Sequence, residues 1–265
     1  MCRMIGCFAQ QEVLLKRLLV EPENSLINQS YQSTSGKLHL NADGFGVAWY
    51  DFRFDDIPAT FKSIQPAWND NNLIHLARKI STPCFLSHVR ASTVGDVNQS
   101  NCHPFTLGKY AFVHNGTIRN FSACKRALVD TIDDALLTEI KGNTDSECLF
   151  LLIMHFYKHS NNLVEATTQA LQWVVDQQRS DPCYSRINLI LTDGDQFLAV
   201  RFASKGAENL GLGYYHNLDI IGSDAYIISS EALFAGDDWH TIPENHMIHG
   251  LRSSPGLAVQ PIQVQ

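Results

Sequence analysis

Segments with the pattern of β-strands lie at both ends of the chain and enclose a middle region with the pattern of α-helices. Sheets and amphipathic helices each need a partner layer to bury their apolar faces. This order therefore predicts an α+β fold in which helices cover the outside of an antiparallel sheet or sheet pair. The expected strands cover residues 4–9, 45–50, 84–90, 110–114, 186–192, 197–203, 226–229, 247–251 and 257–262.

The helical region contains one strong start signal. Thr144-Asp145-Ser146-Glu147 is a capping-box pattern, and it opens an apolar helix over residues 148–157. Residues 25–40 are polar and predict a loop of a length that usually serves a site. We expect further helices over residues 10–20, 72–80, 121–140 (one helix or two) and 162–179.

Charge and apolar pattern exclude several classes of protein. A formal net charge of −7 without a basic run argues against binding to nucleic acid or to an anionic membrane. No apolar stretch approaches the roughly 18 residues that span a bilayer. Charged residues interrupt the start of the chain, which excludes a secretion signal. An odd count of seven cysteines without such a signal predicts reduced thiols in the cytoplasm.

Neither a metal site nor a division into domains is indicated. The pairs Cys84 with His88 and Cys102 with His103 lack the paired spacing of a zinc site, so we expect no metal. No internal repeat, low-complexity tract or long linker is visible. We therefore expect a single domain over residues 1–265.

Cys2 directly follows the initiator Met1. Removal of Met1 would leave a thiol and a free α-amino group on the same residue. A terminal amine has a pKa of about 7.7–8.0, so a fraction of it is neutral near pH 7 and can accept a proton. Cys2 would then combine a nucleophile with its own base. The alternative is that a small residue merely stands second in the chain.

Polar residues follow two of the expected strands. Arg90, with the hydroxyls of Ser92 and Thr93 after it, suits bidentate capture of a carboxylate or else a structural ion pair. Asn115 offers a side-chain NH2 group, and Gly116 lets its backbone N–H approach a ligand closely. Together these two residues can form an oxyanion hole, although Asn-Gly is also a common turn.

Two further residues have competing interpretations. Asp145 either caps a helix N-terminus or receives a substrate ammonium group. His103, just before Pro104, is a pocket residue or a hydrogen-bonded structural donor.

Taken together and in their order along the chain, these motifs resemble the class II glutamine amidotransferases, which are N-terminal nucleophile hydrolases. The resemblance is close over about the first 150 residues, and 229–233 and 239–243 are similar to the family's closing strand and the turn after it. The motifs that carry it are Met1-Cys2-Arg3, Asp43-Gly44-Phe45-Gly46, residues 88–93, residues 101–105, His114-Asn115-Gly116 and Thr144-Asp145-Ser146-Glu147.

The resemblance implies a four-layer αββα fold with two stacked antiparallel sheets, and a cysteine that attacks a γ-carboxamide without any cofactor. By the same resemblance, Cys2 would be the nucleophile, and Asn115 and Gly116 would hold the oxyanion. The substrate α-carboxylate would bind Arg90, Thr93 and the backbone of Val94. Asp145 would pair with the α-ammonium group, and His103 would support the pocket.

The chain departs from the family members that make sugar amines. They carry a tryptophan lid after the arginine and a histidine after the threonine, where this chain has Ala91 and Val94. The sequence to Gln265 leaves no room for a synthase domain, so we expect no ammonia channel within the chain and water as the acceptor.

Stand-alone relatives look closer to this chain. Residues 25–30, 43–50, 66–69 and 101–105 are similar to the glutathione-degrading amidotransferase-like subunit, which typically works with a peptidase-like partner. Three functions stay open: cleavage of a γ-glutamyl peptide such as glutathione, plain glutaminase or amidase activity on another γ-glutamyl compound, and a non-catalytic γ-glutamyl sensor. A peptidase-like or synthase partner protein is possible in each case.

Overall fold

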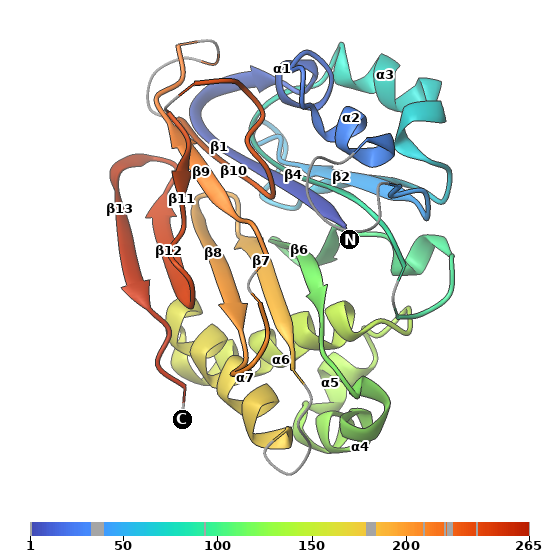
Figure 1. The fold of residues 1–265 in the computed structure, drawn as a ribbon, viewed down its shortest axis with the longest axis vertical. Helices are drawn as coiled ribbons and strands as arrows, with labels where there is room; N and C mark the ends of the chain where they lie inside the picture. The colour runs from blue at the N-terminus through green and yellow to red at the C-terminus, as the bar shows by residue number, and fades with distance from the viewer. Residues whose placement is uncertain are drawn as a thin grey trace.

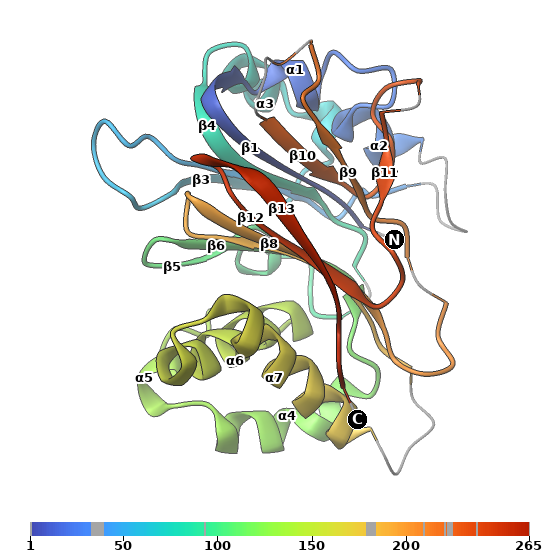
Figure 2. The ribbon, with the colours of Figure 1, turned by 90° about the vertical axis from the view of Figure 1, so that its left-hand side faces the viewer.

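The structure is a computed structural model that describes residues 2–32, 40–92, 94–178, 184–208, 210–219, 221, 225–236 and 238–264. Two antiparallel sheets lie face to face, and helices cover the outer face of each (Figure 2). The expected α+β fold with four αββα layers is confirmed. Among the described residues no helix is both long and apolar enough to cross a membrane.

The first sheet contains the N-terminal strand at its centre. Its order is β11-β9-β10-β1-β4-β2-β3. β1 pairs antiparallel with β10 on one side and with β4 on the other. The strands are β1 (Arg3–Leu14), β2 (Phe45–Trp49), β3 (Ala59–Ser63), β4 (Ser81–Val89), β9 (Gly213–His216), β10 (Ala225–Ser229) and β11 (His240–Thr241).

The second sheet has the order β13-β12-β8-β7-β6-β5. Asp193-Gly194 joins β7 to β8, and Gly194 has a φ of +95°, which glycine adopts without strain. The strands are β5 (Phe105–Leu107), β6 (Tyr110–Thr117), β7 (Arg186–Thr192), β8 (Gln196–Ala203), β12 (His246–Leu251) and β13 (Ser254–Pro261).

The helices form the two outer layers. α1, α2 and α3 cover the first sheet, and α4 to α7 cover the second (Figures 1 and 2). The helices are α1 (Lys16–Leu19), α2 (Leu26–Tyr31), α3 (Asn71–Ala77), α4 (Phe121–Thr131), α5 (Asp134–Leu137), α6 (Asp145–Ser160) and α7 (Leu163–Gln177), with short 3-10 turns at Ala67–Asn69 and Gln99–Asn101.

Three apolar layers hold this stack together, and β1 takes part in two of them. Its residues Ile5 and Cys7 pack toward α1, α2 and α3, whereas Met4 and Phe8 pack between the sheets. Successive side chains of a strand point to opposite faces, so a strand covered on both sides is apolar throughout. Phe8 stacks on Phe197 of the opposite sheet at a ring-centroid distance of 4.3 Å. The N-terminal strand is therefore a buried, central element.

The prediction of a helix over residues 10–20 is wrong for the first half of that range. β1 continues to Leu14, and only Lys16–Leu19 is helical. After a shift of register beyond Phe8, Val13 pairs with Thr82 and Leu14 with Ser81 of β4. Val13 and Leu15 are both buried, a period-2 pattern that suits a sheet.

The structure also contains strands and a helix that the sequence did not predict. β3, β5, β9 and β11 were not expected, and α2 lies within the stretch expected to be a loop. The part of that stretch over residues 33–39 is outside the described residues. The two-helix alternative for residues 121–140 is the one observed, as α4 and α5.

Candidate active site

Cys2 lies immediately before β1, at an end of the central strand of the first sheet. Its Sγ accepts a hydrogen bond from the backbone N–H of Ala91 at 3.2 Å and lies 3.3 Å from the carbonyl oxygen of the same residue. Ala91 follows β4, whose Val89 pairs with Arg3. The antiparallel register of β1 and β4 therefore brings the sulfur to the Ala91 backbone.

Burial is the largest influence on this thiol. It raises the pKa of Cys2 above its ordinary value, and the Ala91 hydrogen bond and the nearby Arg90 charge oppose it only in part. Because the thiolate is the reactive form, nucleophilic attack requires a base that removes the proton.

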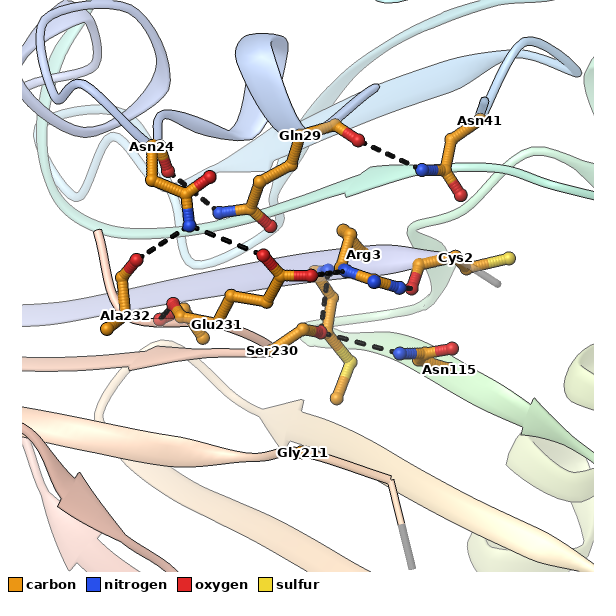
Figure 3. Close-up of polar contacts among 12 residues, drawn as sticks. Cys2, Arg3, Asn24, Gln29, Asn41, Asn115, Gly211, Ser230, Glu231 and Ala232 are labelled. Atoms are coloured by element: carbon orange, nitrogen blue, oxygen red, sulfur yellow. Dashed lines mark hydrogen bonds and ion pairs between the residues drawn. The ribbon is translucent and has the colours of Figure 1, made fainter. Parts of the chain in front are cut away.

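A buried ion pair fixes the backbone next to Cys2. Arg3 Nε lies 2.5 Å from Glu231 Oε1, and another guanidinium nitrogen of Arg3 donates to the Cys2 carbonyl oxygen at 2.9 Å (Figure 3). Asn24 Nδ2 donates to the second carboxylate oxygen of Glu231 at 3.3 Å and to the Ala232 carbonyl oxygen at 2.7 Å. Both charged side chains are almost fully buried, so each depends on the other for its charge compensation.

Asn115 approaches Cys2 from the second sheet. Its Nδ2 donates to Ser230 Oγ at 3.5 Å, and the same hydroxyl accepts the backbone N–H of Met4 at 3.1 Å (Figure 3). Ser230 thus connects the strand that follows Cys2 with the strand that carries Asn115. β6 continues to Thr117, so Asn115 and Gly116 lie inside the strand and do not follow it.

Glycine is the only residue type that fits at position 116. A Cβ atom there would lie 1.9 Å from the carbonyl oxygen of Arg186 on β7. The turn interpretation of Asn115-Gly116 is therefore wrong: close packing of β6 on β7 requires the glycine.

Cys2, Asn115 and Gly116 line one cavity of about 500 Å³. This volume lies within the usual range for small-molecule sites. None of the described residues that line it is an aspartate or a glutamate. The other lining residues are Ala91, Val94, Thr117, Ile118, Arg119, Asn120, Phe121, Ser122, Tyr184, Arg186, Gly206, Ala207 and Leu210.

Arg90 is buried next to the cavity and does not line it. Its guanidinium donates to the carbonyl oxygens of Asp96 at 3.0 Å and Val94 at 3.1 Å, and to Ser92 Oγ at 3.1 Å. Arg90 therefore shapes the loop that brings Val94 to the cavity wall. Thr93 lies outside the described residues.

The same loop is held from the other side by two asparagines. Asn101 Nδ2 donates to the Asp96 carbonyl oxygen at 2.8 Å and to Asn143 Oδ1 at 2.7 Å. Asn101 is fully buried, and sequence reasoning assigned it no role.

Asp145 is the first residue of α6 and is buried behind the cavity. Its Oδ2 accepts the backbone N–H of Ile118, a cavity residue, at 2.8 Å. Its Oδ1 accepts the Ser146 hydroxyl at 3.3 Å. Thr144 caps α6 by accepting the N–H of Glu147 at 3.2 Å, as the capping-box pattern predicts. Asp145 itself does not line the cavity.

His103 is buried in a cluster of histidines behind Arg90 and Asn115. Its ring stacks on His88 at 4.1 Å, and neither of its ring nitrogens has a partner among the described residues. The interpretation of His103 as a hydrogen-bonded structural donor is therefore wrong. Burial lowers the pKa of His103 well below its usual value and that of His88 to about 3, so both rings are neutral at pH 7.

Several residues of the site were not assigned by sequence reasoning. Ala91 acts through its backbone, which no side-chain pattern reveals. Ser230 and Glu231 lie in residues 229–233, which are similar to the family's closing strand. That similarity alone implies no role for either side chain. Arg119 and Arg186 line the cavity without any motif to mark them.

Comparisons with known proteins identify the family of the chain. Residues 18–209 match the family model of class-II glutamine amidotransferases. The chain is 33% identical to the probable glutamine amidotransferase DUG3 of Saccharomyces cerevisiae, over 94% of this chain and 81% of that protein. It is 32% identical to the glutamine–fructose-6-phosphate aminotransferase of Acinetobacter baylyi, but over only 51% of this chain and 20% of that enzyme.

Solved structures show the same fold. A glutamine aminotransferase class-II domain protein from Silicibacter pomeroyi superposes with a TM-score of 0.73 at 26% identity, over 98% of this chain and 99% of that one. The glutamine phosphoribosylpyrophosphate amidotransferase of B. subtilis superposes with a TM-score of 0.65 at 15% identity, over 100% of this chain and 50% of that one. Sequence match and fold together show that the chain belongs to the class-II glutamine amidotransferases.

Proposed function

We propose that this protein hydrolyses a γ-glutamyl amide bond through a thioester on Cys2. The observation that carries the proposal is that Cys2, Asn115 and Gly116 line a single cavity. A nucleophile and two hydrogen-bond donors around one space are the minimum for acyl transfer.

The chemistry requires removal of Met1, which frees the α-amine of Cys2. This amine takes the thiol proton, and the sulfur bonds to the γ-carbonyl carbon while the carbonyl electrons move to its oxygen. Asn115 Nδ2 and the Gly116 N–H stabilise that oxyanion. Collapse of the adduct breaks the C–N bond, and the protonated α-amine returns its proton to the leaving amine. Water then cleaves the thioester by the same route and yields glutamate.

The glutamyl end of the substrate would be held on the Arg90 side of the cavity. Arg90 would supply positive charge for the α-carboxylate, with Thr93 and the backbone of Val94. Asp145 would supply negative charge for the α-ammonium group, and His103 would support the pocket wall. Arg90 and Asp145 are buried, and each has a hydrogen bond to a residue that lines the cavity, which supports their roles.

The leaving group we propose is an amine that carries a carboxylate, as in a γ-glutamyl peptide such as glutathione. Two features support this choice. Arg119 and Arg186 both line the cavity, and within the described part of the chain neither makes an ion pair. The small Ala91 beside the sulfur leaves space for a leaving group larger than ammonia.

The start of α4 adds to the positive character of that end. Phe121 and Ser122, the first residues of the helix, line the cavity, and Asn120 makes no side-chain cap. The first N–H groups of a helix have no intrahelical acceptors and carry partial positive charge. An anionic leaving group suits this end better than ammonia does.

Cys2→Ala tests the nucleophile. We expect no turnover of any γ-glutamyl substrate, whereas Cys124→Ala, which removes a thiol from α4, should keep activity. Mass spectrometry of the active protein should show that Met1 is absent. Activity that survives in Cys2→Ala would refute the thioester mechanism, and binding without turnover by the processed wild type would favour a sensor.

Arg186→Met and Arg119→Met test the leaving group. A hydrogen-bonded charge is worth about 1.5–3 kcal/mol, so kcat/KM for a γ-glutamyl dipeptide should fall by about 10- to 100-fold in each variant. Glutamine and the dipeptide amide should be cleaved as by the wild type. Arg126→Met, on the exposed side of α4 and paired with Asp130, is the matched control. Equal losses on glutamine and dipeptide would contradict the carboxylate subsite.

The same measurements separate the alternatives for the whole protein. A plain glutaminase would cleave glutamine and leave the peptides intact. Addition of a candidate peptidase-like or synthase partner would reveal a dependent activity that the isolated chain lacks. We expect the isolated chain to hydrolyse its substrate with water as acceptor.

A further inference from the structure

A cluster of metal-ligating side chains lies in the outer helical layer, outside the candidate active site. Asp133 stands just before α5, and His155 and His159 lie one turn apart on α6. One ligand atom from each of the three residues lies within 4.8 Å of the other two. We propose that these residues form a binding site for a divalent cation of the zinc class.

The spacing of the first two ligands suits a tetrahedral ion. His155 Nδ1 and Asp133 Oδ1 are 3.4 Å apart. Zinc bonds to histidine nitrogen and carboxylate oxygen measure about 2.0–2.2 Å, which places two ligands of a tetrahedron about 3.3–3.6 Å from each other. His159 follows His155 by four residues, a spacing that puts both rings on one face of a helix.

Both of the partly exposed partners, His155 and Asp133, have unused ligand atoms. His155 Nδ1 is buried and has no hydrogen-bond partner in the described part of the chain. A bound cation would give this buried nitrogen a partner. Asp133 is the N-cap residue of α5, yet its side chain does not cap that helix. Its carboxylate is turned toward α6 instead.

Lys158 occupies the other side of the carboxylate and leaves Oδ1 available. Its Nζ lies 2.7 Å from Asp133 Oδ2, and its side chain is half-exposed. The three protein ligands leave a fourth position for water. Such a site would join the start of α5 to α6, and none of its three residues lines the cavity of the candidate active site.

Zinc titration of the full-length chain tests the proposal. The Cys2→Ala background removes the partly exposed thiol of Cys2, and calorimetry should show one equivalent of Zn²⁺ bound. His159→Gln and Asp133→Asn should each weaken this binding about tenfold or more. His159 is exposed, so its replacement leaves folding intact. His75→Gln, which removes an exposed histidine from α3, should bind as the background protein does.

Cobalt provides an independent readout of the ligands. Co²⁺ should give visible bands of a tetrahedral site without an intense near-ultraviolet thiolate band, and His155→Gln should lose them. Lys158→Gln, which removes a competing cation and no ligand, should bind at least as tightly. Full affinity in His159→Gln and Asp133→Asn, a thiolate band, or loss of binding in Lys158→Gln would each overturn the proposal.

Discussion

The Cys2 thiol is held by backbone groups of a neighbouring strand and not by a basic side chain. Its raised pKa keeps it protonated at neutral pH, so the residue depends on a base within reach. The proposed base, its own α-amine, needs no further residue for positioning. In the proposed mechanism, this amine would let the sulfur act as a nucleophile at a strand end where the described side chains supply no histidine to it.

Asn115 is the side chain on which oxyanion stabilisation should depend. Removal of one such donor typically costs 10²–10³ in kcat. We therefore expect Asn115→Ala to lower kcat by about this factor with little change in KM. Steady-state kinetics measures it, and Asn69→Ala, at an exposed position, is the control. Unaltered kcat would remove Asn115 from the proposed oxyanion hole.

The Arg3–Glu231 pair should act as one unit. Removing one partner of a buried ion pair typically costs about 3–5 kcal/mol, because a charge is left uncompensated. We expect Arg3→Met and Glu231→Leu each to lower the free energy of unfolding by this amount. The double variant should lose much less than the sum. Urea unfolding of the four proteins measures the coupling, and strictly additive losses would contradict it.

Among the elements, α6 links the stability of the outer layer to the cavity. Its first residue, Asp145, accepts the N–H of Ile118, and its N-cap is Thr144. Glu147 accepts the N–H groups of Lys141 and Gly142 at 2.9 and 2.8 Å. The start of this helix thus organises the two segments around it.

Thr144→Ala should lower the free energy of unfolding by about 1 kcal/mol, within the range of about 0.5–2 kcal/mol for a lost N-cap. Thr144→Ser keeps the capping oxygen and should behave as the wild type. Urea unfolding at pH 7 distinguishes the two variants. An equal loss in both would show that the methyl group matters and the cap does not.

At the scale of the whole molecule, the buried histidines make stability depend on pH. Burial lowers the pKa of His88, His103 and His114 in the folded state. Below the unfolded value of about 6.5, the unfolded chain therefore binds protons that the folded chain does not. Stability is fully present above that pH and is lost as the pH falls toward 3.

For His88, with a folded pKa of about 3, the loss of stability between pH 7 and 5 is about 2 kcal/mol. The free energy of unfolding, measured with urea, should decrease as the pH falls across this range. In His88→Gln this decrease should be smaller by about 2 kcal/mol. Stability that is constant from pH 7 to 5 in the wild type would contradict the neutral buried state.

Local patterns in the sequence determined the elements that are stabilised within one short segment. Residues 186–192 were expected as a strand and form β7 with those bounds, because a turn at Asp193-Gly194 connects it to β8. Thr144 marks the start of α6 because its side chain reaches an N–H only three residues away. The family resemblance carried by motifs over about the first 150 residues also implied the four-layer fold.

Only the tertiary structure decided which distant groups meet. Val13 and Leu14 join a strand because β4, some seventy residues later, supplies their partners. Arg3 and Glu231 are 228 residues apart in the sequence, and Cys2 meets the backbone of Ala91. Short-range patterns report a segment's own periodicity and caps, whereas these contacts depend on strand order and register, which long-range packing sets.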